Sequence, residues 1–466
     1  MSNPYAQQSM LPAMFRRWSM GVKLLFVCFL ALLMMIPALL VDSLITERQN
    51  RQADVVKEIS QHAGGQQTFL GPVLAVPYDI PATSPTDHAK HGMYFIFPAD
   101  ASATVKTTTE ERHRSLFRVP VFQAALKLDS TFDLTGVPAA APQGATLDWD
   151  HAEVVVGVSD PRGALADAVL TAADKTVTLA PAQIAPNITV TGQTNLPTGQ
   201  TNQQVRLTLF GTRLPETIQP NRQFTVSAAL RFSGAQRLAV LAYGKTTHLN
   251  EQGDWPSPGF DGTFLPETRT VTNSGFTADW SVPFMARGVR AEGTIGFVMG
   301  LADTAMGVSF IEVADPYQSV NRSLKYVPLF LGLVFLSYFI FEVTTRRRVH
   351  PAQYILVGIA QIIFYLLLLS LAERIGFDFG FLIAGGATVA LLAINAGWIF
   401  ASRLQGFRAL VTFTLLYVLI YLLLRLEDNA LLVGAIASFA AVAAAMYFTR
   451  SIDWYSSLPA GASDAQ

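Results

Sequence analysis

Six long apolar segments constrain this 466-residue chain more than any other feature of its sequence. The first runs from Val22 to Val41, and its only charge is Lys23 at the entrance. Five more follow towards the C-terminus, at about residues 327–343, 352–372, 377–400, 408–426 and 430–448. Because about 20 apolar residues in a helix cross the roughly 30 Å hydrocarbon core of a bilayer, we expect six transmembrane helices.

The charged residues are concentrated between the first and the second apolar segments. Residues 46–326 hold 22 of the 33 Lys and Arg and 26 of the 34 Asp and Glu. Over the whole chain only 14% of residues are charged and the mean hydropathy is +0.34, against about 25% charged in a soluble domain. The middle region is therefore predicted to be a water-soluble domain inserted between membrane segments. The balanced net charge of −1 argues against a nucleic-acid partner.

Basic residues near the ends of the apolar segments predict the orientation of the chain. Six crossings place both termini on one side of the membrane. Nine basic residues lie on that side: Arg16, Arg17, Lys23, Arg346, Arg347, Arg348, Arg403, Arg408 and Arg450. Only Arg374 and Arg425 lie on the opposite side of the C-terminal segments. Because cytoplasmic loops carry the excess of Lys and Arg, we expect cytoplasmic termini and an extracytoplasmic middle domain.

The first apolar segment has a second interpretation, a cleaved signal peptide. Its apolar run is long for that purpose, and no small-x-small cleavage site clearly follows it. We therefore favour an uncleaved anchor helix, which Pro37 would kink. The predicted layout is residues 1–45 for the cytoplasmic N-terminus and first helix, 46–65 for a helical stalk, 66–326 for an extracytoplasmic β-rich domain, 327–448 for helices two to six, and 449–466 for a cytoplasmic tail.

The extracytoplasmic domain is predicted to be rich in antiparallel β-strands. Apolar residues recur at helical spacing up to Gly64-Gly65, where the stalk should end. Beyond that point the period becomes two, as in residues 122–128, 205–209 and 224–232, and Val154-Val155-Val156 indicates a more buried strand. This alternation is typical of a sandwich-like fold, either one large sandwich or two smaller ones. Residues 137–145 and 191–203 have the composition of loops.

An aromatic and proline-rich segment, residues 254–269, is a candidate partner-binding loop. Its candidate contact residues are Trp255, Phe260 and Phe264. Such a loop suits docking of a partner. The competing interpretation is structural, because the same rings would also close one end of a sandwich.

Motifs that carry chemistry are scarce. The sequence has no phosphate-binding loop and no G-x-S-x-G nucleophile motif, and it implies no cofactor. Ser159 before Asp160-Pro161 is best explained as a strand end entering a turn. Asp87, His88 and His91 could share a metal, but a solvated loop is the simpler interpretation. The single cysteine, Cys28, excludes an intramolecular disulfide.

Ionisable and polar groups inside the apolar segments are few, and each suggests a functional hypothesis because burial in a bilayer is costly. Glu342 lies close in sequence to Arg346–Arg348, and we expect an ion pair with them. Asn395 is interpreted as the one polar group well inside a span. Gly380/Ala384 and Gly386/Ala390 are small pairs that would permit close helix contacts.

The sequence resembles the CreD family of inner-membrane proteins over nearly its whole length. The similarity is carried by five strings in matching order: "GGQQTFLGPVLAVPY", "RVPVFQAAL", "DWPSPGFDGTFLP", "GVSFIEVADPYQSVNRSLKY" and "HPAQYILVG". The similarity is densest from the fourth string onward, which begins at Gly307. The resemblance implies a multi-pass protein of the bacterial inner membrane with residues 46–326 in the periplasm, and a role in cell-envelope integrity and stress response. It implies no catalytic residues.

Three functional hypotheses follow. We favour a non-enzymatic envelope protein whose β domain binds an envelope protein, lipid or peptidoglycan-related partner. The first alternative is a transporter or lipid-handling protein whose bundle uses Glu342, Asn395 and Arg425 as polar lining. The second is a metal-dependent envelope hydrolase. The sequence does not predict the oligomeric state.

The junction between the β domain and the helices is predicted to couple the two. Arg322, Lys325 and Tyr326 suit the outer headgroup layer, where long cations and aromatic rings rest at an interface. We group them with three polar residues of the helical region as candidate coupling residues: Glu342, His350 and Asn395.

Overall fold

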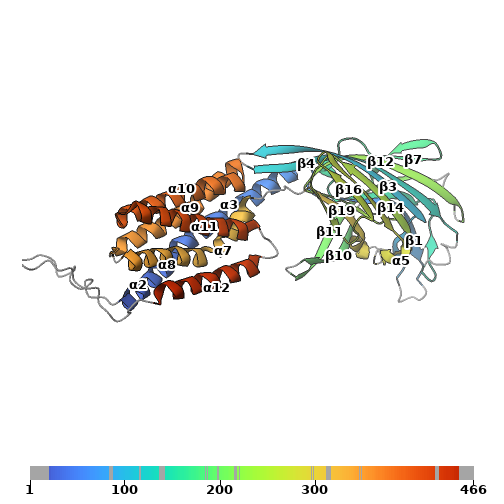
Figure 1. Ribbon diagram of the computed structural model, residues 1–466. Helices are drawn as coiled ribbons and strands as arrows, with labels where there is room; N and C mark the ends of the chain where they lie inside the picture. Colours follow the sequence, from blue (N-terminus) through green and yellow to red (C-terminus); the bar gives the residue numbers. More distant parts are fainter. Residues whose placement is uncertain are drawn as a thin grey trace, which may run out of the picture. The chain divides into compact units, whose positions relative to one another are not determined.

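The computed structural model describes residues 20–450 apart from short gaps. The gaps are residues 83–87, 115–116, 136–141, 184, 186, 197–198, 215–217, 220, 295, 297–298, 311–315, 346, 348 and 426–429. The chain forms two compact units. The helix unit comprises the described residues of Met1–Arg51 and Ala314–Gln466, and the sheet unit comprises those of Gln52–Val313 (Figure 1).

The helix unit contains the expected apolar helices. Their bounds are α2 Met20–Leu33, α3 Met35–His62, α8 Val327–Thr345, α9 Pro351–Ile375, α10 Phe377–Ile399, α11 Arg403–Arg425 and α12 Ala430–Thr449. The part of α3 after Arg51 belongs to the sheet unit. Five are long and apolar enough to cross a membrane: the joined α2–α3 helix and α8 to α11. The last helix, α12, spans 20 residues and has an apolar sequence as well. The prediction of an N-terminal apolar helix and a C-terminal group of apolar helices is confirmed.

The first apolar helix changes from α2 to α3 at Met34, three residues before Pro37. Proline lacks the N–H that would bond back to Leu33, which accounts for a local break there. Buried residues on this helix recur at three- and four-residue steps: Val27, Leu30, Met34, Ala38, Val41 and Ile45. Met34 packs over Gly358 of α9, where an added Cβ would lie 2.7 Å from the Met34 Cγ.

A short helix that the sequence analysis did not predict, α7 Pro316–Lys325, precedes α8. It packs against α9, α10, α11 and α8. Its inward side includes Val320 and Ser323, both fully buried. Charged and polar residues around these two masked the helical period in the sequence, because only a narrow apolar stripe is needed to dock so short a helix.

The sheet unit consists of two sheets. The larger has eleven strands in the order β10-β11-β6-β1-β13-β19-β15, with β2, β5, β9 and β18 attached beside this path. Its bounds are β1 Gln67–Ile80, β2 Lys90–Ile96, β5 Thr146–Leu147, β6 Glu153–Val158, β9 Ala180–Pro181, β10 Asn187–Leu196, β11 Gly199–Arg213, β13 Arg237–Leu241, β15 Pro258–Gly262, β18 Glu292–Thr294 and β19 Ala305–Phe310.

The smaller sheet has eight strands in the order β16-β17-β14-β3-β4-β12-β7-β8. Its bounds are β3 Asp100–Arg114, β4 Phe117–Asp133, β7 Val169–Ala172, β8 Lys175–Thr178, β12 Gln223–Ala235, β14 Thr246–Gly253, β16 Thr268–Thr272 and β17 Gly275–Val282. The short elements α5 Phe284–Arg287, η2 Pro161–Gly163 and η3 Met299–Thr304 complete the unit. Nearly all strand pairs are antiparallel, but β1 pairs with β13 and β3 with β14 in parallel.

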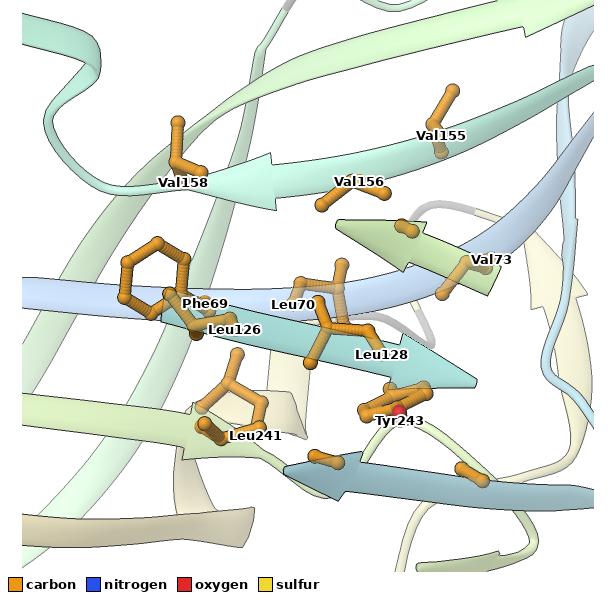
Figure 2. Packing of buried hydrophobic residues seen from close by; sticks show 14 of the residues in the cluster. Phe69, Leu70, Val73, Leu126, Leu128, Val155, Val156, Val158, Leu241 and Tyr243 are labelled. Atoms are coloured by element: carbon orange, nitrogen blue, oxygen red, sulfur yellow. The ribbon is translucent and has the colours of Figure 1, made fainter. Parts of the chain in front are cut away.

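One continuous cluster of buried residues lies between the two sheets. Figure 2 shows Leu126 and Leu128 of β4 beside Phe69 and Leu70 of β1, with Val155, Val156 and Val158 of the neighbouring strand β6 above them in the view. The period-two pattern of β12 is buried on alternate residues, and β6 is buried throughout, as expected. The described strands therefore form one large sandwich rather than two small ones.

The prediction of a loop over residues 191–203 is wrong for most of that range. Asn187–Leu196 and Gly199–Arg213 form a hairpin whose register runs from Asn187 opposite Thr208 to Leu196 opposite Gly199. The two strands contain six threonines (Thr189, Thr191, Thr194, Thr201, Thr208 and Thr212), and β-branched residues favour strands. The glutamines and asparagines between them suggested a loop.

Candidate functional site

A buried polar cluster surrounds Glu342 in the helix unit. The Glu342 side chain is 1% exposed, and its Oε1 forms an ion pair with the Lys23 Nζ. The backbone N–H of Val349 donates to the same Oε1 at 2.9 Å, and the Tyr354 hydroxyl donates to Oε2 at 2.9 Å. Both carboxylate oxygens are therefore satisfied, and the charge is compensated within the cluster.

Three helices supply this cluster: α2 gives Lys23, α8 gives Glu342 and α9 gives Tyr354. The connection before α9 is held as well, because Lys23 donates to the Val349 carbonyl at 3.3 Å. His350 is the N-cap of α9: its Nδ1 accepts from the Ala352 N–H at 3.2 Å, and Pro351 follows at the first helical position. His350, an exposed residue, thus orients the start of α9.

The sequence analysis expected Arg346–Arg348 as the partners of Glu342, and the structure gives Lys23 instead. Arg346 and Arg348 lie outside the described residues. Lys23 is 319 positions away from Glu342 in sequence, so nearness along the chain could not reveal the pair. Because a buried charge without a partner costs several kcal/mol, this ion pair ties the first apolar helix to the C-terminal ones.

Asn395 lies half-buried on α10 and donates to the Tyr338 hydroxyl at 3.5 Å. That hydroxyl in turn donates to the Leu392 carbonyl at 2.9 Å. The sequence analysis interpreted Asn395 as the one polar group well inside a span, and the structure corrects this. Gln361 of α9 is 1% exposed, and its side-chain oxygen accepts from the Tyr417 hydroxyl at 3.1 Å. Thr388 of α10 is also buried. Gln361 was overlooked because its span is otherwise strongly apolar.

The candidate coupling residues Arg322, Lys325 and Tyr326 lie on α7 and the turn that follows it. Lys325 is exposed, whereas Arg322 and Tyr326 are half-buried. The Tyr326 N–H donates to the Ser323 carbonyl at 3.1 Å, and the Tyr326 carbonyl accepts from Phe330 as α8 begins. Tyr326 is thus the joint between α7 and α8. These three residues are not part of the Glu342 cluster.

The aromatic residues of the candidate partner-binding loop pack inward. Trp255 is 8% exposed and its ring meets Phe310 edge-on, with ring centroids 6.5 Å apart. Phe260, on β15, contacts the rings of Phe276 and Trp280 at 5.9 and 6.1 Å. Phe264 is half-buried, and its carbonyl accepts from the Trp280 indole N–H at 3.0 Å. The rings complete the core at this end of the sandwich, as the structural interpretation expects.

An open groove lies beside the edge strand β16. It has a volume of about 500 Å³. Its lining residues come from β3, β14, β16, β17 and the adjoining turns, and half of them carry hydroxyls, among them Thr108, Thr270, Thr272 and Ser274; Lys106 adds a positive charge. All five residues of β16 are exposed. Asp254 borders the groove, and its Oδ1 accepts from the Thr109 backbone N–H at 2.8 Å and from its hydroxyl at 2.6 Å.

Two ionisable side chains are buried in the sheet unit. Glu251 on β14 is fully buried, neither carboxyl oxygen has a hydrogen-bond partner among the described residues, and burial with the nearby Asp261 raises its pKa to about 8. Arg287 on α5 lies 4.1 Å from the Phe97 ring centroid and donates through Nε to the Ala242 carbonyl at 2.9 Å. Burial lowers the pKa of Arg287 to about 10. Sequence alone gave no signal for either.

The hypothetical metal site gains no support from the described residues. Asp87 lies outside them. His91 contacts the Asp79 carboxylate across the β1–β2 pair. Within the described ranges, no three or more His, Cys, Asp or Glu side chains gather closely enough to hold a metal ion.

Ser159 directly follows β6, and its hydroxyl forms hydrogen bonds with backbone groups, as the turn interpretation predicts. Its hydroxyl donates to the Gln66 carbonyl at 3.0 Å and accepts from the Thr68 N–H at 2.9 Å. Asp160 then caps η2, and its hydrogen bond with the Arg162 side chain lowers the pKa of the Asp160 carboxyl.

Comparisons with known proteins agree with the resemblance seen in the sequence. The profile of the family described as "Inner membrane protein CreD" matches residues 19–455. The inner membrane protein CreD of Escherichia coli (strain K12) is 32% identical over 439 residues, which cover 92% of each chain. A match of this length includes both units and every apolar helix described above. The chain therefore belongs to the CreD family of inner membrane proteins.

Proposed function

We propose that this protein is a non-enzymatic component of cell-envelope integrity and stress response. Its helix unit anchors it in the inner membrane, and its sheet unit binds an envelope component or a protein partner on the periplasmic side. The observation that carries the proposal is the groove along the fully exposed edge strand β16, where half of the lining residues carry hydroxyls. An open edge offers backbone donors and acceptors to an extended partner, and the surrounding hydroxyls suit polar ligands.

The periplasmic placement is supported by where the Glu342 cluster lies along the helices. It joins the start of α2, the end of α8 and the start of α9. The excess of Lys and Arg assigns these three ends to the cytoplasmic side. The sheet unit follows the far end of the α2–α3 helix and precedes α8, so it belongs on the other side of the membrane.

The transporter alternative gains no support from its proposed polar lining. Glu342 is enclosed in an ion pair, Asn395 bonds Tyr338, and Arg425 pairs with Asp378 at the end of α11. These three contacts involve different partners at different helix positions, so the three side chains do not converge on one site.

Site-directed photo-crosslinking in intact cells tests the proposal. A photoreactive residue at Thr272, on the groove, should give a discrete crosslinked product. The matched control is Val177 on β8, an exposed residue on the opposite edge strand of the same sheet. Equal crosslinking at both positions, or none at Thr272, would contradict binding at the groove.

The coupling residues remain a second, separate part of the proposal. Combined Arg322→Ala and Tyr326→Ala should impair complementation of a deletion strain while leaving membrane insertion intact. Full complementation by this variant would remove α7 and its turn from the functional account.

A further inference from the structure

An apolar groove runs along the flank of the helix unit between α10 and α11. It has a volume of about 450 Å³ and is lined almost entirely by apolar side chains and glycine. Phe381, Val389 and Tyr417 form its buried base. Leu382, 70% exposed, and Val418, 48% exposed, form its rims.

The groove is open because glycine lies where α10 would otherwise project a side chain. Gly386 lines it, and a Cβ added there would meet nothing within 4 Å. The sequence analysis assigned Gly386 to a close helix contact, and the structure shows open space instead. Gly380, by contrast, does make such a contact, because its added Cβ would lie 2.9 Å from the Ala372 nitrogen of α9.

One end of the groove is polar. Asp378, in the first turn of α10, forms an ion pair with Arg425, the last residue of α11. The Tyr421 hydroxyl donates to the Asp378 Oδ1 at 3.1 Å, and the Arg425 Nε donates to that hydroxyl at 3.4 Å. Both charged side chains are about half exposed, at 50% and 55%. The polar end therefore offers one carboxylate and one guanidinium to a ligand.

The length of the groove matches one leaflet of a bilayer. Eleven residues separate Asp378 from Val389, which is about 16 Å along a helix. Half of the hydrocarbon core is about 15 Å. An acyl chain that starts at the charged end would therefore reach the middle of the membrane within the groove.

We infer that this groove holds a zwitterionic phospholipid with a primary ammonium headgroup, of the phosphatidylethanolamine class. One acyl chain lies over Gly386, the phosphate meets Arg425, and the ammonium meets Asp378. Guanidinium binds phosphate oxygens through paired N–H donors, and a carboxylate accepts from ammonium. An anionic headgroup brings no cation to the Asp378 carboxylate, and a choline headgroup brings a cation that has no N–H to donate.

Native mass spectrometry of the full-length protein from nanodiscs tests the inference. The discs contain phosphatidylethanolamine, phosphatidylglycerol or phosphatidylcholine. We expect one retained phosphatidylethanolamine per chain and about tenfold less retention of the other two, as the loss of one charge-assisted hydrogen bond predicts. Gly386→Leu should abolish retention. The control Gly332→Leu, in α8, also meets open space but lies off the groove and should change nothing.

Asp378→Asn distinguishes headgroup recognition from a simple acyl slot. It should remove the preference for phosphatidylethanolamine over phosphatidylglycerol while an acyl chain is still retained. Equal retention of all three lipids by the native protein, or retention unaffected by Gly386→Leu, would overturn the inference and indicate annular lipid only. Retention of a second protein chain instead of lipid would overturn it in favour of a dimer contact.

Discussion

Removing the positive charge of Lys23 is expected to destabilise the helix unit strongly. In Lys23→Met the Glu342 carboxylate, 1% exposed, keeps only the Val349 N–H and the Tyr354 hydroxyl as partners. Leaving one member of a buried ion pair uncompensated costs about 3–5 kcal/mol. For a unit of this size each kcal/mol lowers Tm by about 2–4 °C, so the helix unit should melt about 6–20 °C lower.

The assay is thermal unfolding of the detergent-solubilised protein, followed by circular dichroism at a wavelength where helices dominate. Lys23→Met combined with Glu342→Gln should recover most of the loss, because both charges are gone and the amide oxygen still accepts a hydrogen bond. Lys325→Met, which removes an exposed lysine from α7, is the matched control. The reasoning is refuted if Lys23→Met melts within about 2 °C of the native protein, or if the double variant is no more stable than the single one.

Two further predictions concern the sheet unit. Because the pKa of Glu251 is raised from 4.5 to about 8, its contribution to stability is full below pH 4.5 and is lost as the pH rises to about 8. The Tm of Glu251→Gln should therefore rise relative to that of the native protein across this pH window. A difference in Tm that stays constant with pH would contradict the prediction. Gly64→Ala should prevent folding or lower the free energy of unfolding by several kcal/mol. Gly64 has φ +94°, and an added Cβ would lie 2.5 Å from the Gly163 Cα. An unchanged yield and Tm of this variant would contradict the prediction.

The helices were predictable because their signal is local. An apolar stretch of about 20 residues needs no partner to be recognised, and the expected ranges agree with α8 to α12 within a few residues. The strands of alternating pattern were found for the same reason, since Phe224 to Phe232 bury one face only. The hairpin of β10 and β11 was not found, because glutamine and asparagine resemble loop residues until a neighbouring strand pairs with them.

The polar sites were harder to predict because their partners are distant in sequence. Glu342 was singled out correctly as a costly charge, but its partner Lys23 could be found only from the packing of α2 against α8. Gln361 lies on an apolar helix whose pattern it barely interrupts. Glu251 lies on a strand of mostly polar residues, Thr246–Gly253, so its burial could not be told from its neighbours in sequence. The two grooves are formed by residues that are distant in sequence, at an edge strand in one case and at a glycine between two helices in the other, so neither could be predicted before the fold was known.

The central claim is that the sheet unit lies outside the cytoplasm while both ends of the helix unit face into it. The most direct measurement is labelling with a membrane-impermeant thiol reagent after Cys28→Ser, which removes the one native cysteine. Asn273→Cys, in the exposed turn after β16, should react in cells whose outer membrane alone is permeabilised. Arg450→Cys should react only after the inner membrane is opened. The reverse pattern would contradict the account.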